Sequence, residues 1–168
     1  KALKFYSKAI EIKPDYAESY YNKGITLKDK GDLNNAIENF KKANNINPGF
    51  IESYYNMGNV LKEKGELEAA IECYKQVITI DPNYAGAYNN MGMALKEKGE
   101  LEAAIECYKQ VIMIDPNYAG VYNNMGIALH DNKDKEAAIK NFKQAIKINP
   151  DYSEAYSNMG NVNEDNGD

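Results

Sequence analysis

A period of 34 residues runs through this chain and constrains its fold more than any other feature. Proline, glycine and alanine each recur at this spacing, and the segments 62–84 and 96–118 differ only in Thr79 versus Met113. The recurring residues are Pro14, Pro48, Pro82, Pro116 and Pro150; Gly24, Gly58, Gly92, Gly126 and Gly160; Ala2, Ala36, Ala70, Ala104 and Ala138. A fixed period of this length indicates stacked supersecondary units, because one unit alone buries too little surface to be stable.

Each unit is predicted to form two antiparallel helices, as residues 85–118 illustrate. Apolar and aromatic residues recur there three or four positions apart, which is the spacing of amphipathic helices. They are Tyr88, Met91, Leu95, Leu101, Ile105, Tyr108, Val111 and Ile112. Gly99 is expected to end the first helix, because glycine adopts the left-handed C′ conformation at little cost. Asp115 is disfavoured in helical geometry by Pro116 and should end the second helix.

The conserved spacing of small residues predicts close helix packing within each unit. Gly92 and Ala104 are expected to face each other, since two backbones approach closely only where side chains are this small. Tyr108 and Val111 should then fill the space toward the neighbouring repeat. The outer face of the second helices, for instance at Glu68, should be solvated.

The repeated pattern resembles the tetratricopeptide repeat. The first half of that motif, aromatic-x-x-apolar-Gly-x-x-Leu, is present as Tyr54, Met57, Gly58 and Leu61. The second half, Ala, aromatic, small and Pro, is present as Ala70, Tyr74, Val77 and Pro82. The resemblance covers essentially the whole chain. It implies an all-α fold, a right-handed α-solenoid superhelix of 34-residue helix-turn-helix repeats.

Two repeats depart from this pattern. In the first, Lys23 stands where Met57 stands in the second, which should weaken inward packing. In the fourth, Lys133 takes the place of the glycine that ends the first helix, and Lys135 replaces a leucine. A non-glycine residue in left-handed geometry costs about 1–2 kcal/mol, so this turn is expected to be rearranged or looser.

The register predicts a single array over residues 1–168. Four full repeats span residues 17–50, 51–84, 85–118 and 119–152. Residues 1–16 correspond to the second helix of a partial repeat, and residues 153–168 to the first helix of another. The chain is therefore expected to be a slice of a longer array. The alternative is a natural chain with half-repeat caps, which Asn163 favours because it is polar where Leu27 and Leu61 are apolar.

Composition argues against several classes of function. Asp and Glu number 25 against 20 basic residues, all of them lysine, and nucleic-acid readers depend on basic patches and arginine. No apolar run approaches the roughly 18 residues of a membrane span. Cys73 and Cys107 lie one repeat apart, beyond disulfide reach, which favours free thiols in a reducing compartment such as the cytoplasm. His130 is the only histidine, so we expect no metal site, no cofactor and no catalytic residue.

The resemblance also implies an inner groove lined by the first helix of each repeat. Its groove-facing positions carry Glu18, Tyr21, Ile25 and Lys28; Glu52, Tyr55, Asn59 and Lys62; Gly86, Asn89, Met93 and Lys96; Gly120, Asn123, Ile127 and His130. Beside them runs an asparagine ladder, made of Asn22, Asn56, Asn90, Asn124 and Asn158. Tyrosine and methionine are favoured at interfaces, so the energetic centre is predicted at Tyr55, Asn59, Asn89, Met93 and Asn123.

The asparagine ladder has two interpretations. A carboxamide offers two donors and an acceptor, so the ladder can hold the backbone of an extended peptide without reading its side chains. This is similar to the asparagine ladder in the repeat domain of O-GlcNAc transferases. The alternative is that these asparagines serve helix packing. A clamp for a partner's carboxylate is not expected, because the chain has no arginine and carries Glu52 and Asn56 at clamp positions.

These observations favour a non-catalytic scaffold that binds an extended or helical segment of a partner protein in its groove. An alternative is a substrate-recruiting arm of a larger enzyme, such as an O-GlcNAc-type glycosyltransferase. A third possibility is a structural array that self-associates end to end, because an uncapped array exposes apolar faces on its terminal helices.

Overall fold

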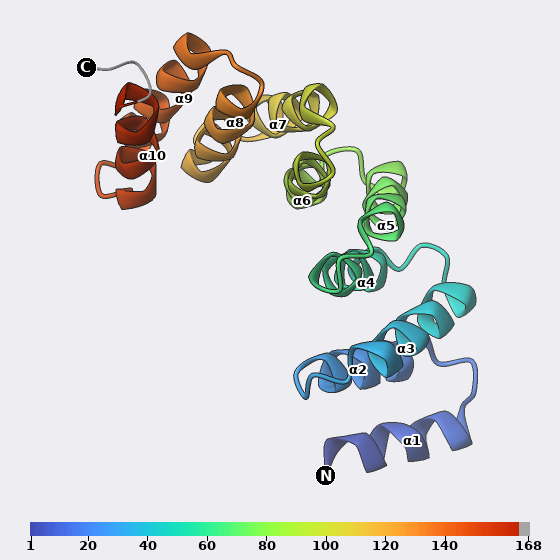
Figure 1. Ribbon diagram of the computed structural model, residues 1–168. Helices are drawn as coiled ribbons and strands as arrows, with labels where there is room; N and C mark the ends of the chain where they lie inside the picture. The colour runs from blue at the N-terminus through green and yellow to red at the C-terminus, as the bar shows by residue number, and fades with distance from the viewer. Residues whose placement is uncertain (165–168) are drawn as a thin grey trace. The chain divides into compact units, whose positions relative to one another are not determined.

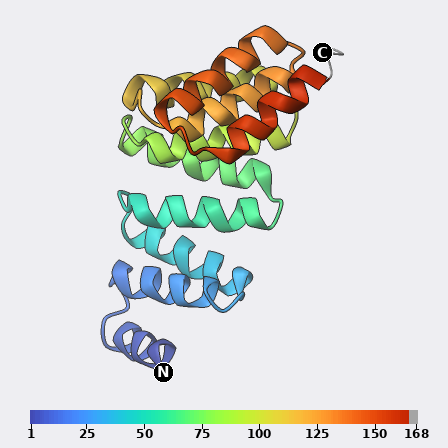
Figure 2. The ribbon, with the colours of Figure 1, turned by 90° about the vertical axis from the view of Figure 1, so that its left-hand side faces the viewer.

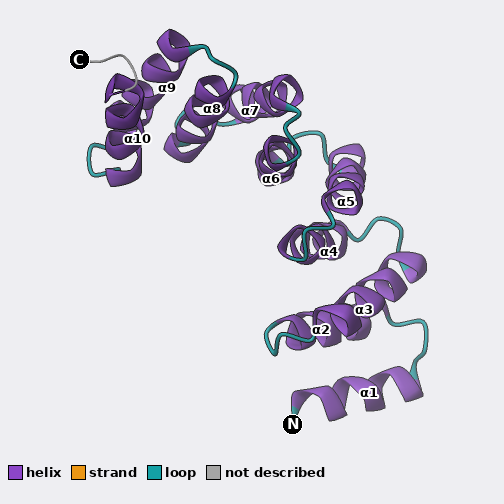
Figure 3. Ribbon diagram, viewed as in Figure 1, coloured by secondary structure: helices purple, strands orange, loops and turns teal. Residues whose placement is uncertain are grey.

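The computed structural model describes residues 1–164, and these form ten helices and no strand (Figures 1 and 3). The helices are α1 (Ala2–Ile12), α2 (Ala17–Lys28), α3 (Leu33–Ile46), α4 (Ile51–Glu63), α5 (Leu67–Ile80), α6 (Ala85–Glu97), α7 (Leu101–Ile114), α8 (Ala119–Asp131), α9 (Lys135–Ile148) and α10 (Ser153–Glu164). The predicted fold class, an all-α solenoid of helix-turn-helix repeats, is confirmed.

The chain divides into two compact units, Lys1–Pro82 and Asn83–Asp168. In the first unit, α1 to α5 follow one another in chain order (Figure 2), and each helix packs against the next. Helix α2 also contacts α4. In the second unit, α6 to α10 pack in the same order, and α8 contacts both α6 and α10. Within each unit, the first helices of successive repeats therefore form one layer and the second helices another.

The turn inside each repeat has the geometry that the sequence predicts. Gly99 has a φ of 82°, and the Glu100 amide donates to the Leu95 carbonyl at 2.9 Å. These features close the last turn of α6 and direct the chain into α7. Asp115 has extended backbone (φ −135°, ψ 92°) ahead of Pro116, and it ends α7 as expected.

Lys133 adopts the same turn, so the expectation of a rearranged loop is wrong. Its φ is 67°, and the amide of Asp134 donates to the Leu129 carbonyl at 2.9 Å, as at the glycine turns. The Asp134 carboxylate also accepts from the Ala137 amide at 3.1 Å and caps α9. These hydrogen bonds offset the cost of left-handed backbone at an exposed lysine.

The first helices α2, α4, α6 and α8 each carry a glycine beneath an aromatic ring of their own repeat. A Cβ placed on Gly92 would lie 2.6 Å from Cε1 of Tyr108, and one on Gly58 would lie 2.8 Å from Cε1 of Tyr74. The atoms nearest to the Gly92 position all belong to the Tyr108 ring, so this ring, rather than an approach to Ala104, requires the glycine. Tyr74 and Tyr108 are 0% exposed and are the largest fully buried side chains.

Lys23 behaves differently from Met57 at the equivalent position. Met57 is buried, whereas Lys23 is half-buried and its Nζ donates to Ser7 Oγ on α1 at 3.1 Å. The substitution thus replaces an apolar contact with a hydrogen bond between α1 and α2.

Candidate functional site

The predicted groove tyrosines of the first unit lean against its aromatic core. The Tyr21 ring, on α2, lies 4.9 Å from the Phe50 ring and 6.0 Å from the Phe40 ring. The Tyr55 ring, on α4, lies 6.1 Å from the Tyr74 ring. Both tyrosines are half-buried, so each presents only part of its ring to a partner. Burial, with the nearby Glu52 carboxylate, raises the pKa of Tyr21.

Two asparagines of the ladder lie in the first unit. Asn56 Nδ2 donates to Tyr21 Oη at 3.3 Å and to the Glu52 carbonyl at 2.8 Å. Asn22 is exposed, and its side chain makes no hydrogen bond within residues 1–164. One ladder amide is therefore fixed to the preceding repeat, and the other faces solvent.

In the second unit the equivalent hydrogen bonds join two asparagines. Asn124 Nδ2 donates to Asn89 Oδ1 at 3.0 Å, and Asn158 Nδ2 donates to Asn123 Oδ1 at 3.0 Å. Asn89 Nδ2 in turn donates to Oδ1 of the half-buried Asn90 at 3.1 Å. Asn124 and Asn158 thus each join their own helix to the first helix of the preceding repeat.

Asn89 and Asn123 do not offer the open contact surface expected of them. They are 7% and 3% exposed, because the ladder asparagine of the next repeat covers each one. Their carboxamides accept hydrogen bonds inside the helix layer. They position the ladder amides.

In three ladder asparagines the inward bonds engage the amide nitrogen and leave the side-chain oxygen. The amide nitrogens of Asn56, Asn124 and Asn158 are engaged by the protein. Their Oδ1 atoms accept no hydrogen bond within residues 1–164, and the three side chains are half-exposed. These three side chains therefore have free carbonyl oxygens whose position is fixed by the bonds of their amide nitrogens, an arrangement that suits N–H donors of a partner.

One groove position differs in chemistry from repeat to repeat. It is Asn59 on α4, Met93 on α6 and Ile127 on α8, all half-buried. Asn59 Oδ1 accepts from Tyr74 Oη at 2.9 Å. Met93 Sδ lies 3.7 Å from Asn89 Nδ2.

Met93 stands at the position that Asn59 occupies one repeat earlier, and a methionine does not provide the acceptor that Asn59 provides. Tyr108, the equivalent of Tyr74, is therefore without an acceptor. Tyr108 Oη is buried and has no hydrogen-bond partner in the described part of the chain. Its pKa is raised by burial first, then by Cys107 and Glu97. The signal was visible in the sequence, since Tyr74 and Tyr108 are identical while their partners on the first helix are not.

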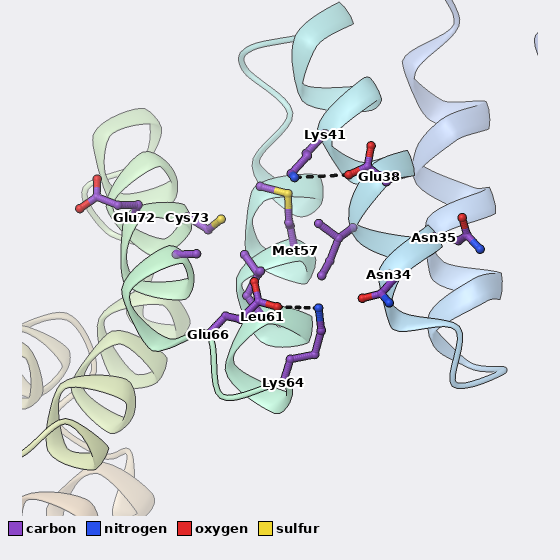
Figure 4. A pocket seen from close by; sticks show the side chains of 12 residues that line it. Asn34, Asn35, Glu38, Lys41, Met57, Leu61, Lys64, Glu66, Glu72 and Cys73 are labelled. Atoms are coloured by element: carbon purple, nitrogen blue, oxygen red, sulfur yellow. Dashed lines mark hydrogen bonds and ion pairs between the residues drawn. The ribbon is translucent and has the colours of Figure 1, made fainter.

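A pocket between α3, α4 and α5 was not predicted (Figure 4). Its volume is about 640 Å³, and its apolar lining includes Ile37, Met57 and Leu61. The rim carries two ion pairs, Lys41 with Glu38 at 3.4 Å and Lys64 with Glu66 (Figure 4). Met57 and Leu61 lie four positions apart on α4, which was the available signal in the sequence.

The same pocket recurs in the second unit, which limits its value as a specific site. A pocket of about 490 Å³ there is lined by Ile105, Met125 and Leu129, the equivalents of the three apolar residues above. Its rim carries Lys109 and Lys140, while Asn141 replaces Cys73. A pocket at equivalent positions in both units follows from the repeat geometry itself.

The cysteines are not equipped for nucleophilic chemistry. Both are buried and free. Burial, followed by the Glu72 carboxylate, raises the pKa of Cys73 to about 12, although Lys41 opposes this. Burial and then Glu106 raise the pKa of Cys107 to about 11. Since the thiolate is the reactive form, both thiols are protonated and inert at neutral pH.

Two other kinds of site are absent from residues 1–164. No group of three or more His, Cys, Asp or Glu side chains is placed to hold a metal ion. No helix in this part of the chain has the length and apolar character needed to cross a membrane.

Comparison with known proteins places this geometry in context. A sequence model described as TPR repeat matches residues 1–31, 26–65, 58–99, 92–133 and 128–167. The chain is similar to the crystal structure of MamA, at 31% identity and a TM-score of 0.83, over 87% of this chain and 85% of that chain. No curated protein matches the chain in sequence.

Two other solved structures support the fold alone. MamA 41-end from Desulfovibrio magneticus RS-1 is 22% identical, with a TM-score of 0.83 over 90% of this chain and 85% of that chain. Pseudomonas aeruginosa PilF is 21% identical, with a TM-score of 0.76 over 87% of this chain and 67% of that chain.

Proposed function

The chain belongs to the tetratricopeptide repeat family and is thereby a protein-interaction scaffold, and we propose that the asparagine ladder binds the backbone of an extended segment of a partner protein. One observation in the second unit carries this proposal: the Oδ1 atoms of Asn124 and Asn158 accept no hydrogen bond within residues 1–164, while their amide nitrogens are held by the protein. Asn56 in the first unit has the same arrangement. An extended segment has free backbone N–H groups that such oxygens accept.

The inward hydrogen bonds favour binding because they fix the acceptors in advance. A side chain that is already ordered loses less conformational entropy when a partner arrives. The two interpretations of the ladder therefore support each other, since the same amide packs one helix on the next through nitrogen and binds through oxygen. Selectivity for particular partners then comes from the neighbouring Tyr55, Met93 and Ile127.

The test begins with peptides selected from a random display library on the 168-residue chain. Their affinities are compared between the natural chain and the triple variant N56A/N124A/N158A. The control is N45A, which makes the same chemical change at an exposed position of α3. Circular dichroism comes first, because N124A leaves the buried Asn89 oxygen without its donor.

Backbone N-methylation of the selected peptides makes this test specific for the acceptor role. Methylation removes one N–H donor at a time, so affinity should fall at separate positions along the peptide and not elsewhere. In the triple variant these losses should disappear. Equal affinities for the natural and triple-variant chains would overturn the proposal and leave the ladder with a packing role only.

Self-association is a second candidate, favoured by the surface of α10. A Cβ on Gly160 would meet no atom within 4 Å, whereas the equivalent glycines on α2, α4, α6 and α8 each lie under an aromatic ring. The equivalent aromatic residue on α1 is Tyr6, and Phe5 beside it is 65% exposed. We propose that α1 of a second copy covers this surface.

Sedimentation velocity over a range of concentrations tests this second candidate. The natural chain should associate as its concentration rises, and G160L should block that association by filling the surface above the glycine. N45L serves as a control of equal size at an exposed position. A natural chain that stays monomeric at high concentration would exclude it. A substrate-recruiting arm of a larger enzyme would bind in the same way as the leading proposal and is distinguished by the full-length sequence.

A further inference from the structure

Tyr108 is the feature of the second unit that the proposed function does not use. Its side chain is 0% exposed, and its hydroxyl has no hydrogen-bond partner within residues 1–164. Burying a hydroxyl without a partner is unfavourable, and nearly all buried polar groups in proteins are paired. Phenylalanine fills the equivalent position in α3 and α9 as Phe40 and Phe142, so the ring packing itself does not require a hydroxyl.

The position of Tyr74 shows where the Tyr108 hydroxyl lies. Both rings cover a glycine at nearly the same distance, 2.8 Å at Gly58 and 2.6 Å at Gly92. Tyr74 Oη reaches Asn59 Oδ1, a groove residue, at 2.9 Å. The equivalent residue for Tyr108 is Met93, so the repeat equivalence points to a Tyr108 hydroxyl beside the Met93 side chain of α6.

Electrostatics agree with this placement. Glu97 lies one helical turn after Met93 on α6, and its charge is one cause of the raised pKa of Tyr108, after burial and Cys107. The hydroxyl therefore lies near the side of α6 that carries residues 93 and 97. A raised pKa also means that the hydroxyl keeps its proton and remains a donor at neutral pH.

We propose that Tyr108 is the hidden donor of a subsite for a backbone carbonyl oxygen of the bound segment, with Met93 as its movable cover. Methionine suits this role because its side chain is unbranched and flexible, and it is half-buried here. When a segment binds, the thioether moves aside and the hydroxyl gains the acceptor that it lacks in the free chain. The inference rests on the proposed function, since it concerns the same surface.

The subsite complements the asparagine ladder through a shared residue. Asn89 holds the ladder residue Asn124 through Oδ1, and its Nδ2 lies 3.7 Å from Met93 Sδ. The carboxamide that holds the acceptor Asn124 thus also contacts Met93, the proposed cover of the donor Tyr108 Oη. A peptide unit carries one N–H and one C=O, so this pairing fits a peptide backbone.

The first test uses N,N-dimethylacetamide, a carbonyl acceptor without an N–H donor. The methyl resonance of Met93, assigned with M93L, is followed by NMR during a titration. We expect a saturable shift in the natural chain and none in Y108F. Y108F should fold, because it removes only the unpaired hydroxyl, and Y74F is the matched control that should leave the shift intact. A natural chain whose Met93 signal does not respond, or a Y108F signal that responds equally, would overturn the subsite.

The second test uses the display-selected peptides and separates the two proposals. Y108F should weaken their binding about 2- to 10-fold, the range for one neutral hydrogen bond. M93N should weaken binding similarly by capturing the hydroxyl as Asn59 does, and the double variant M93N/Y108F should lose no more than either. Alanine scanning of the peptides should not reproduce the loss, because the acceptor is a backbone carbonyl. If dimethylacetamide binds but no peptide is selected, the proposed function fails while the subsite stands; unchanged peptide affinity in Y108F overturns the subsite alone.

Discussion

The α4–α5 pair and the α6–α7 pair have nearly the same second helix but different first helices. Segments 62–84 and 96–118, which contain α5 and α7, differ only in Thr79 versus Met113. On the first helices, Asn59 is exchanged for Met93, and this one exchange decides whether the buried tyrosine hydroxyl has an acceptor. Repetition in sequence therefore preserves the packing of the rings while the polar chemistry of the groove varies.

The largest expected effect tests the ring packing, which should be equal in the two helix pairs. G58A and G92A should each lower the free energy of unfolding by about 1–3 kcal/mol, because the added methyl group overpacks against a buried ring. The Cβ would lie 2.8 Å and 2.6 Å from the rings of Tyr74 and Tyr108. Urea unfolding followed by circular dichroism measures both.

G160A is the control for this pair, because no atom lies within 4 Å of a Cβ on Gly160. It should be neutral or stabilise α10 by up to about 1 kcal/mol through helix propensity. If G92A were tolerated while G58A was not, the two rings would not be packed equivalently, and the inferred position of the Tyr108 hydroxyl would lose its basis.

Exchanging Asn59 and Met93 tests the hydrogen bonding of the buried tyrosine hydroxyls, in which the two helix pairs should differ. N59M removes the Asn59 acceptor of Tyr74 and should destabilise the chain by about 1–2 kcal/mol, because a buried hydroxyl loses this hydrogen bond. M93N supplies an acceptor to Tyr108 and should be stabilising by about 0.5–1.5 kcal/mol. The same urea unfolding experiment measures both, and shifts of the same sign would contradict the comparison.

Removing each hydroxyl gives a smaller and sharper contrast. Y74F should cost about 1 kcal/mol, since it breaks the 2.9 Å hydrogen bond to Asn59. Y108F should change stability by less than about 0.5 kcal/mol, because the hydroxyl it removes has no partner to lose. Thermal unfolding of the two variants side by side measures this contrast, and an equal loss would show that Tyr108 has a hydrogen bond in solution.

The helices could be predicted from the sequence because their signals are local. The apolar spacing within residues 85–118 and the turn at Gly99 depend on neighbours a few positions away, and both predictions agree with α6 and α7. Lys133 shows the limit of such reasoning, because its turn is retained by hydrogen bonds that propensity alone does not include.

The site could be predicted only in part, because its chemistry depends on contacts between repeats. The sequence identifies the ladder, but it does not show that Asn124 covers Asn89 or that Asn158 covers Asn123. Asn44 is a similar case: it is 5% exposed with no partner for its amide in residues 1–164, where other repeats have isoleucine. A polar residue in an apolar column is visible in the sequence, but its burial is not.

The smallest expected difference between the two helix pairs is in their cysteines, Cys73 and Cys107. Because the two thiols should behave alike, they serve as a control for the comparison. The folded-state pKa values, about 12 for Cys73 and about 11 for Cys107, lie above the ordinary value of 9.0. Folding therefore favours the protonated thiols, and this stabilisation is complete below pH 9 and lost as the pH rises toward 11 to 12.

At pH 8 both thiols should react with a chromogenic disulfide far more slowly than a free cysteine, in the natural chain and in Y108F alike. C73A and C107A should each flatten the decline of stability above pH 9. Rapid modification of Cys107 alone at pH 8 would show that the α6–α7 pair opens more readily than α4–α5, and the difference between the pairs would then lie in dynamics as well as in the groove.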